Sequence, residues 1–110
     1  MMDCNCERYK DYFGSTPKYL FELTVDDLTM ADFDFQVRLQ RGPNAVVIEK
    51  DEMIVDGEGN YFITFDTKAL GIGPVRAIII ASLPDTDYPD GVRTEVDVIE
   101  NFTEILELPQ

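Results

Sequence analysis

The amino-acid sequence predicts an all-β fold, a β-sandwich of about seven or eight short antiparallel strands. Hydrophobic and polar residues alternate in several stretches, which is typical of a strand with one buried and one solvent-facing side. Turn-forming residues separate these stretches roughly every 8–12 residues, as in sandwiches and barrels. Strands that alternate with long helices are absent from the pattern, which excludes the nucleotide-binding α/β folds.

The first segment, residues 1–17, is predicted to be a polar N-terminal arm that ends in a Gly-Ser-Thr-Pro turn. Tyr9, Tyr12 and Phe13 are its aromatic anchors. Because aromatic residues are enriched at the cores of interfaces, we expect these three to contact a partner. The alternative is that they cover the edge of the chain's own sandwich.

The clearest strand runs from Phe33 to Gln40, where every odd position is hydrophobic and every even position is polar. A helix over the same residues would split the hydrophobic set between its faces. An earlier strand over 19–25 alternates in the same way. Three further strands, separated by turns rich in Gly, Pro and Asn, are predicted at 45–48, 53–55 and 61–65.

The second half of the chain supplies the remaining elements. Residues 67–71 are predicted to form one helical turn that ends at a glycine. The stretch 75–83 is almost continuously apolar, so its strand is covered on both faces or lies centrally in its sheet. Residues 92–98 alternate again. At 102–108 a capping-box pattern fits a helical turn, but the shortness of the segment and the following proline favour a final strand.

Residues 18–110 are therefore expected to form one sandwich domain with immunoglobulin-like Greek-key connections. The Cys-Trp-Cys pattern of antibody domains is missing, since the chain contains no tryptophan. A chain of 110 residues is long enough to bury a core without a metal or a disulfide.

The charge of the chain excludes several partners. It has 9 Lys and Arg against 22 Asp and Glu, a net charge of −13. Such a chain repels phosphate, so we expect no nucleic-acid partner and no binding to an anionic membrane surface. No apolar stretch is long enough to span a bilayer, and the N-terminus lacks the apolar segment of a signal peptide. The acidity itself favours solubility and repulsion between subunits.

Cys4 and Cys6 form a Cys-x-Cys pair near the start of the chain. A disulfide between them would close a very small, strained ring, and two cysteines without any histidine cannot complete a tetrahedral metal site. The pair predicts two reduced thiols, with bridging between subunits as the alternative.

The chain shows no pattern of an enzyme and calls for no cofactor. It lacks histidine, the commonest general base, and it has no glycine-rich phosphate loop and no Gly-x-Ser-x-Gly motif. Paired carboxylates remain, but with 22 acidic residues some pair always meets the spacing of a glycosidase. We therefore predict a protein without catalytic residues.

The most distinctive polar constellation is the segment 85–91. Asp85, Asp87 and Asp90 supply carboxylates of the kind that Ca²⁺ prefers, and they form a weak candidate calcium site. Their spacing departs from the EF-hand, Pro89 intervenes, and no glutamate closes the loop. We favour a rigid loop between strands, in which the proline fixes the backbone and the Asp-Gly pair turns the chain.

The stretch Asp-Thr-Asp-Tyr-Pro-Asp-Gly-Val-Arg-Thr-Glu-Val, from Asp85 to Val96, resembles a pattern in small β-sandwich proteins of tailed phages and prophages of Bacteroidales. The segments 60–66 and 69–75, which lead into an apolar strand, fit the same pattern, and the resemblance covers residues 19–108. It implies a baseplate, tail-fibre or head-fibre module that assembles without catalysis. No site residue carries over from it.

The sequence therefore predicts a non-catalytic structural protein of a virion, made in the bacterial cytoplasm. It would act by self-association into a homo-oligomer or by docking on another virion protein, for which an exposed sheet edge or the arm can serve as the joint. Two alternatives stay open. One is a carbohydrate- or cell-surface-binding module, with Tyr88 as a contact, and the other is an acidic inhibitor directed at the host.

Overall fold

The computed structural model describes residues 2–4 and 9–109, and in these residues the fold is all-β. Its helical elements within that range are short 3-10 turns, η1 (Met30–Asp32), η2 (Lys50–Glu52) and η3 (Thr67–Ala69). The strands are β1 (Met2–Cys4), β2 (Tyr9–Tyr12), β3 (Lys18–Phe21), β4 (Leu23–Val25), β5 (Asp34–Arg41), β6 (Asn44–Glu49), β7 (Ile54–Val55), β8 (Tyr61–Thr64), β9 (Gly73–Pro84) and β10 (Val92–Leu106).

The largest sheet has five strands in the order β2-β10-β9-β5-β6. β9 lies between β10 and β5, with Ile79 opposite Asp97 on one side and Val37 on the other. This position confirms the prediction that the strand over the apolar stretch 75–83 lies centrally in its sheet. Neighbouring strands of this sheet are antiparallel, except that β2 runs parallel to β10. The predicted all-antiparallel pattern is therefore wrong at this one pair. The chain runs in the same direction through β2 as through β10.

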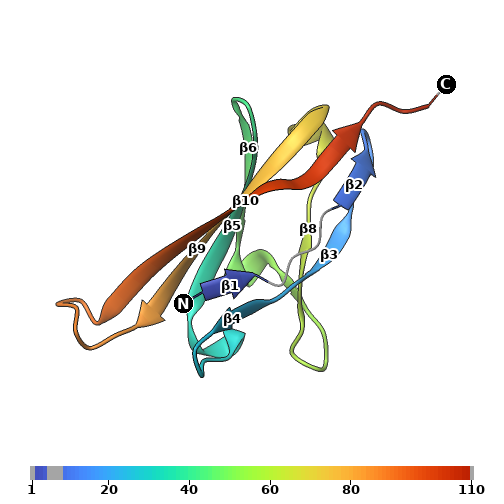
Figure 1. Ribbon diagram of the computed structural model, residues 1–110. Coiled ribbons are helices and arrows are strands. Elements are labelled where there is room, and N and C mark those ends of the chain that lie inside the picture. Colours follow the sequence, from blue (N-terminus) through green and yellow to red (C-terminus); the bar gives the residue numbers. More distant parts are fainter. Residues whose placement is uncertain (1, 5–8, 110) are drawn as a thin grey trace.

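Two smaller sheets complete the fold. One has the order β3-β8-β7, and the other pairs β1 with β4. The described residues thus form ten strands, more than the seven or eight expected. The segment 1–17 contributes two and the strand predicted at 19–25 divides into β3 and β4, whereas the strands predicted at 92–98 and 102–108 form one, β10. Figure 1 shows β3 and β4 following one another along one side of the molecule.

A single hydrophobic core joins these sheets. It contains Val37 and Leu39 from β5, Ile79 from β9 and Ile63 from β8, all at most 1% exposed. The odd positions of 33–39 are buried and the even positions are not, as the alternation predicts. The same holds for the positions of the early strand that follow Tyr19: Phe21, Leu23 and Val25 are buried.

β10 is one strand of 15 residues where two were expected, and its faces are opposite to a simple hydrophobic pattern. Val96 and Val98 are 58% and 47% exposed, whereas Arg93 and Glu95 are partly buried. The register explains this arrangement. Arg93 lies opposite the buried Leu83, and residues directly opposite in a ladder share a face of the sheet. The hydrophobic side of β9 therefore draws the charged side of β10 inward.

The β9–β10 hairpin gives the molecule its elongated shape. The molecule measures 55 × 32 × 20 Å along its principal axes. In Figure 1 the hairpin extends from the body at the lower left and carries the loop 85–91 at its tip. The other end of β10 lies beside β2, so one strand links the projecting hairpin with the N-terminal segment.

Candidate functional site

The structure contains two surfaces on which an assembly role could rest, the N-terminal segment and the projecting hairpin. The N-terminal segment pairs with the rest of the chain at two places, through β1 on β4 and through β2 on β10. Of the predicted interface residues, Tyr9 and Phe13 are half-buried and pack against the core, whereas Tyr12 is 49% exposed. Tyr12 is thus the most exposed of the three.

A polar cluster fastens β2 to its neighbours. Asp11 accepts a hydrogen bond from the hydroxyl of Tyr19 in β3 and a second one, 2.6 Å long, from the hydroxyl of Thr103 in β10. The ring of Tyr9 stacks on that of Tyr19 at a centroid distance of 3.6 Å, and Phe102 meets both rings edge-on. One carboxylate therefore connects the neighbouring strands β2 and β3 with β10, which is far from both in the sequence.

This environment raises the pKa of Tyr19 well above its ordinary value of 10.0. Burial of the phenol is the largest cause, followed by its hydrogen bond to Asp11 and by the negative charge of that carboxylate. Tyr19 is therefore a neutral hydrogen-bond donor across the usual pH range, and its role in the cluster is structural.

The turn after β2 is held by a buried threonine. Thr67, which is fully buried, accepts a hydrogen bond from the backbone N–H of Gly14 at 2.8 Å and donates one to the carbonyl of Ser15 at 2.9 Å. Buried polar groups of this kind are stable only when they are paired. Together with the Asp11 cluster, this contact makes residues 9–15 an integral part of the folded domain.

The expectation of reduced thiols is wrong at Cys4, which is disulfide-bonded. Cys4 is the last residue of β1 and lies opposite Leu23 of β4. Cys6 lies outside the described residues.

In the loop 85–91 the carboxylates bind the loop's own backbone. Asp85 accepts a hydrogen bond from the N–H of Asp87, and Asp90 accepts one from the N–H of Val92. Among residues 2–4 and 9–109, no group of three or more Asp, Glu, Cys or His side chains could hold a metal ion. Asp85 and Asp90 thus each accept a hydrogen bond from a backbone N–H two positions further along the chain.

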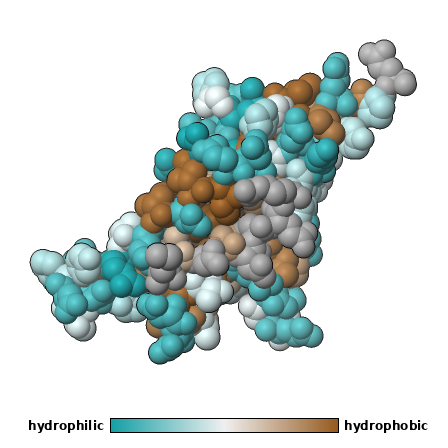
Figure 2. All heavy atoms as spheres, viewed as in Figure 1, coloured by the Kyte–Doolittle hydropathy of each residue, from teal (hydrophilic) through white to brown (hydrophobic). Residues whose placement is uncertain are grey.

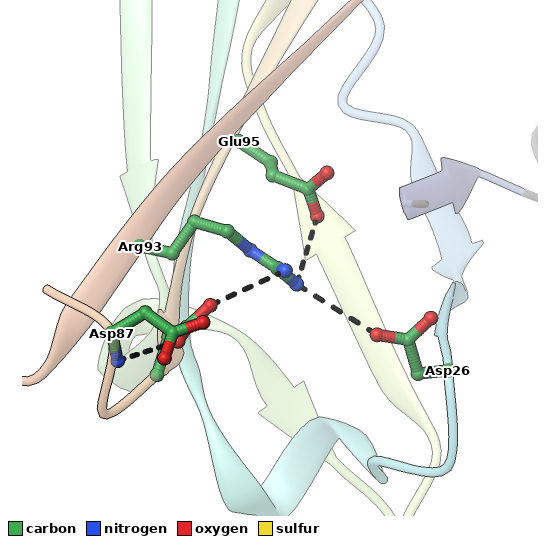
Figure 3. Close-up of polar contacts among 5 residues, drawn as sticks. Asp26, Asp87, Arg93 and Glu95 are labelled. Carbon is green, nitrogen blue, oxygen red and sulfur yellow. Dashed lines mark hydrogen bonds and ion pairs between the residues drawn. The ribbon is translucent and has the colours of Figure 1, made fainter.

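Arg93 is the centre of an acidic cluster on the inner side of the hairpin. Its guanidinium lies 3.5 Å from Asp85, 3.6 Å from Glu95 and 3.7 Å from Asp26, and Figure 3 shows it reaching between Glu95 and Asp26. Arg93 Nε and Glu95 Oε2 are buried without a hydrogen-bond partner in the described part of the chain. One cation thus faces three carboxylates. Within the described residues, Arg93 and Glu95 each keep one buried polar atom that could form a further hydrogen bond.

The outer side of the hairpin is hydrophobic at its base. The exposed β-branched side chains Val96 and Val98 lie opposite Ile80 and Ile78 of β9. Figure 2 shows hydrophobic surface where the hairpin meets the body, and a hydrophilic tip beyond it. Exposed apolar rows rimmed by polar residues commonly mark protein interaction sites. The sequence did not reveal this surface because the alternation of 92–98 predicts that the valine face is the buried one.

Two open grooves lie elsewhere. One, of about 290 Å³, lies beside the Arg76–Glu100 ion pair, whose closest atoms are 2.9 Å apart. The other, of about 620 Å³, lies around Lys50, which donates a hydrogen bond of 2.7 Å to the carbonyl of Phe33 and faces the ring of Phe35. Lys50 and the Arg76–Glu100 pair are thus engaged within the chain, and Asp34, Glu49 and Asp51 also line the second groove.

Within residues 2–4 and 9–109, no helix is long and apolar enough to cross a bilayer. Comparison with protein-family models, with curated proteins and with solved structures gave no match.

Proposed function

We propose that this chain is a non-catalytic structural protein that acts by assembly, through self-association or by docking on another protein. The observation that carries the proposal is the exposed β-branched row of β10, in which Val96 is 58% and Val98 47% exposed. Solvent-facing apolar residues arranged in a row on a sheet are costly unless a partner covers them. The net charge of −13 keeps the isolated chain soluble.

The proposed fold is an immunoglobulin-like sandwich, and the strand order supports it. That fold places strands A, B, E and D in one sheet and strands C, F and G in the other. Here β1, β4 with β3, β8 and β7 correspond to A, B, E and D, and β5, β9 and β10 correspond to C, F and G. β6 then extends the second sheet as in variable-type domains.

The proposed setting is the virion of a tailed phage or prophage, with the chain synthesised in the bacterial cytoplasm and the other virion proteins as partners. The likeness of residues 85–96 to small sandwich proteins of such phages supports this setting. The chain's net charge of −13 supports it as well, because mutual repulsion keeps subunits apart until a specific surface joins them.

The test is to find the chain in particles. Phage particles released by the bacterium that encodes the chain are separated on a density gradient, and the chain is quantified by mass spectrometry in every fraction. We expect a constant ratio of the chain to the major virion protein across the particle peak. A chain that stays in the soluble fractions while particles sediment would overturn the proposal, and binding of the purified chain to a glycan would then favour the surface-binding alternative.

A further inference from the structure

β10 has a long backbone edge that is unpaired among the described residues. From Val92 to Ile99 it pairs with β9 on one side. On the other side, β2 pairs with it only from Thr103 to Leu106. β1 approaches β10 but forms its ladder with β4. An exposed edge of this kind is a template for a further strand.

The backbone groups that point to this edge follow from the hairpin. The N–H of Asp85 donates to the carbonyl of Gly91 at 2.9 Å, so these two residues form a hydrogen-bonded pair. Hydrogen-bonded and non-hydrogen-bonded pairs alternate along an antiparallel ladder. The N–H and C=O groups of Thr94, Val96 and Val98 therefore point away from β9, toward the open edge.

The outward side chains of the same residues show what is missing beside them. Val92, Val96 and Val98 are 37%, 58% and 47% exposed, whereas Ile78 and Ile80 in the same sheet face are only partly exposed. β9 has a neighbour on each side, whereas β10 between Val92 and Ile99 pairs only with β9 among the described residues. A strand added at this edge would cover the outward valines of β10 in the same way as β10 covers Ile78 and Ile80 of β9.

We propose that a second copy of this chain adds to the edge, antiparallel, with the two Thr94 residues opposite one another. This register places Val92 opposite the second copy's Val96, and the reverse, on the outer face. On the inner face it places Arg93 opposite the second copy's Glu95, twice by symmetry. The two Arg93–Glu95 pairs are non-hydrogen-bonded pairs, in which side chains approach most closely. Valine pairs, a threonine pair and opposite charges are all favourable across strands.

The neighbouring registers are worse. A register centred on Glu95 sets two glutamates against one another, and one centred on Val96 sets Glu95 against the second copy's Asp97 twice. Like charges directly opposite destabilise a strand pair. Arg93 and Glu95 keep 30% and 27% of their side chains exposed, so both can respond to a second strand. The sequence of β10 is therefore self-complementary in one register.

This dimer rests on the proposed function, since it names the surface of self-association, but it can fail separately. Inward-pointing charges are also a device by which proteins keep sheet edges from pairing. On that alternative the chain is a monomer at every concentration, and Arg93 and Glu95 only prevent another strand from pairing with the edge.

The first experiment compares two valines of the same outer face by sedimentation velocity of the full chain over a wide concentration range. Val96→Asp alters the open part of β10, whereas Val47→Asp, the control, alters a 41% exposed valine on β6 at the other side of the sheet. We expect a concentration-dependent dimer that Val96→Asp weakens about tenfold or more, because two valine pairs are lost by symmetry. A monomeric parent chain, or equal loss in both variants, would overturn the proposal.

A charge exchange tests the register. Arg93→Glu and Glu95→Arg each oppose like charges across the symmetry axis, so each variant alone should lose the dimer, whereas an equimolar mixture should form a one-to-one heterodimer. Two monomers in the mixture would contradict the register. If Arg93→Glu unfolds the chain, as far-ultraviolet circular dichroism would show, concentration-dependent amide protection at Thr94 and Val96 in the parent chain decides instead. Particles that hold the chain while the pure chain is monomeric would leave the virion role intact and remove only the dimer.

Discussion

Asp11 is the residue on which the position of β2 depends most. Its carboxylate accepts hydrogen bonds from Tyr19 and Thr103, and Thr103 is fully buried. Hydrogen bonds to a charged group contribute more than neutral ones, and a buried hydroxyl left without its acceptor is costly. Removing the carboxylate therefore affects both the fastening of the N-terminal segment and the packing of β10.

We expect Asp11→Ala to lower the free energy of unfolding by about 2–3 kcal/mol, since a charged acceptor is removed and its donors are left unpaired. Lys10→Ala, the control, removes an exposed side chain of the same strand and should change stability by no more than about 0.5 kcal/mol. Urea unfolding of both variants measures the difference. Equal midpoints would show that the cluster does not hold β2.

Tyr19 makes the stability of the chain depend on alkaline pH. Its pKa is raised in the folded state by burial, by the hydrogen bond to Asp11 and by that residue's charge. The unfolded chain therefore gives up this proton more readily than the folded chain does. The stabilisation is complete below the ordinary pKa of 10.0 and is lost as the pH rises above it.

Thermal unfolding of the parent chain and of Tyr19→Phe, measured from neutral pH upward, checks this prediction. We expect the parent chain to lose stability more steeply above pH 10.0 than the variant, which has no phenol at this position. At neutral pH the variant should be less stable, because the hydrogen bond to Asp11 is gone. Parallel alkaline slopes would mean that Tyr19 ionises as easily in the folded chain as in the unfolded one.

At the scale of the elements, what the sequence predicts depends on how far the partners of a strand lie along the chain. The alternation from Phe33 to Gln40 gives both the strand and its buried face, because local pattern and core agree there. In β10 the local pattern gives the strand but misplaces the faces, since the register against β9 decides them. The Asp11 cluster was not predictable, because Asp11 and Thr103 are 92 positions apart and no local pattern links them.

The bulge in β10 is a second element that local pattern does not reveal. From Ile99 to Thr103 the strand advances four residues while β9 advances two, from Ala77 to Val75. Asn101 lies within the bulge with a φ of 54°, in the left-handed region. The extra residues bring the side chain of Phe102 into the core, where it contacts Tyr9 and Tyr19.

We expect Asn101→Val to destabilise the chain by about 1–2 kcal/mol, because a β-branched residue is strained at positive φ. Asn101→Gly, the matched control, adopts this conformation freely and should be nearly neutral. Chemical unfolding of both variants measures the effect. A valine variant as stable as the parent would show that the bulge relaxes without cost.

At the scale of the whole molecule, electrostatic repulsion is the dominant constraint. The net charge of −13 is spread over a surface on which some carboxylates are also held by local hydrogen bonds. The hydrogen bonds from Asn60, for example, lower the pKa of Asp56, so this carboxylate stays charged to a more acidic pH. Basic residues are few, and Arg93 and Arg76 already face acidic neighbours. Compaction and association of such a chain both bring like charges together.

Salt should therefore stabilise this protein at two levels. Raising the ionic strength from about 0.01 M to 0.15 M shortens the screening length from about 30 Å to about 8 Å, which is less than the width of the molecule. We expect the thermal midpoint to rise and the β10 dimer to tighten over this range, because long-range repulsion is screened more than the short Arg93–Glu95 contacts are. Differential scanning calorimetry and sedimentation, each with sodium chloride, measure the two effects. A midpoint that falls with salt would show that the ion pairs of Arg93 and Arg76 outweigh the repulsion. A dimer that weakens would show that attraction between opposite charges, not the valine row, holds the two chains together.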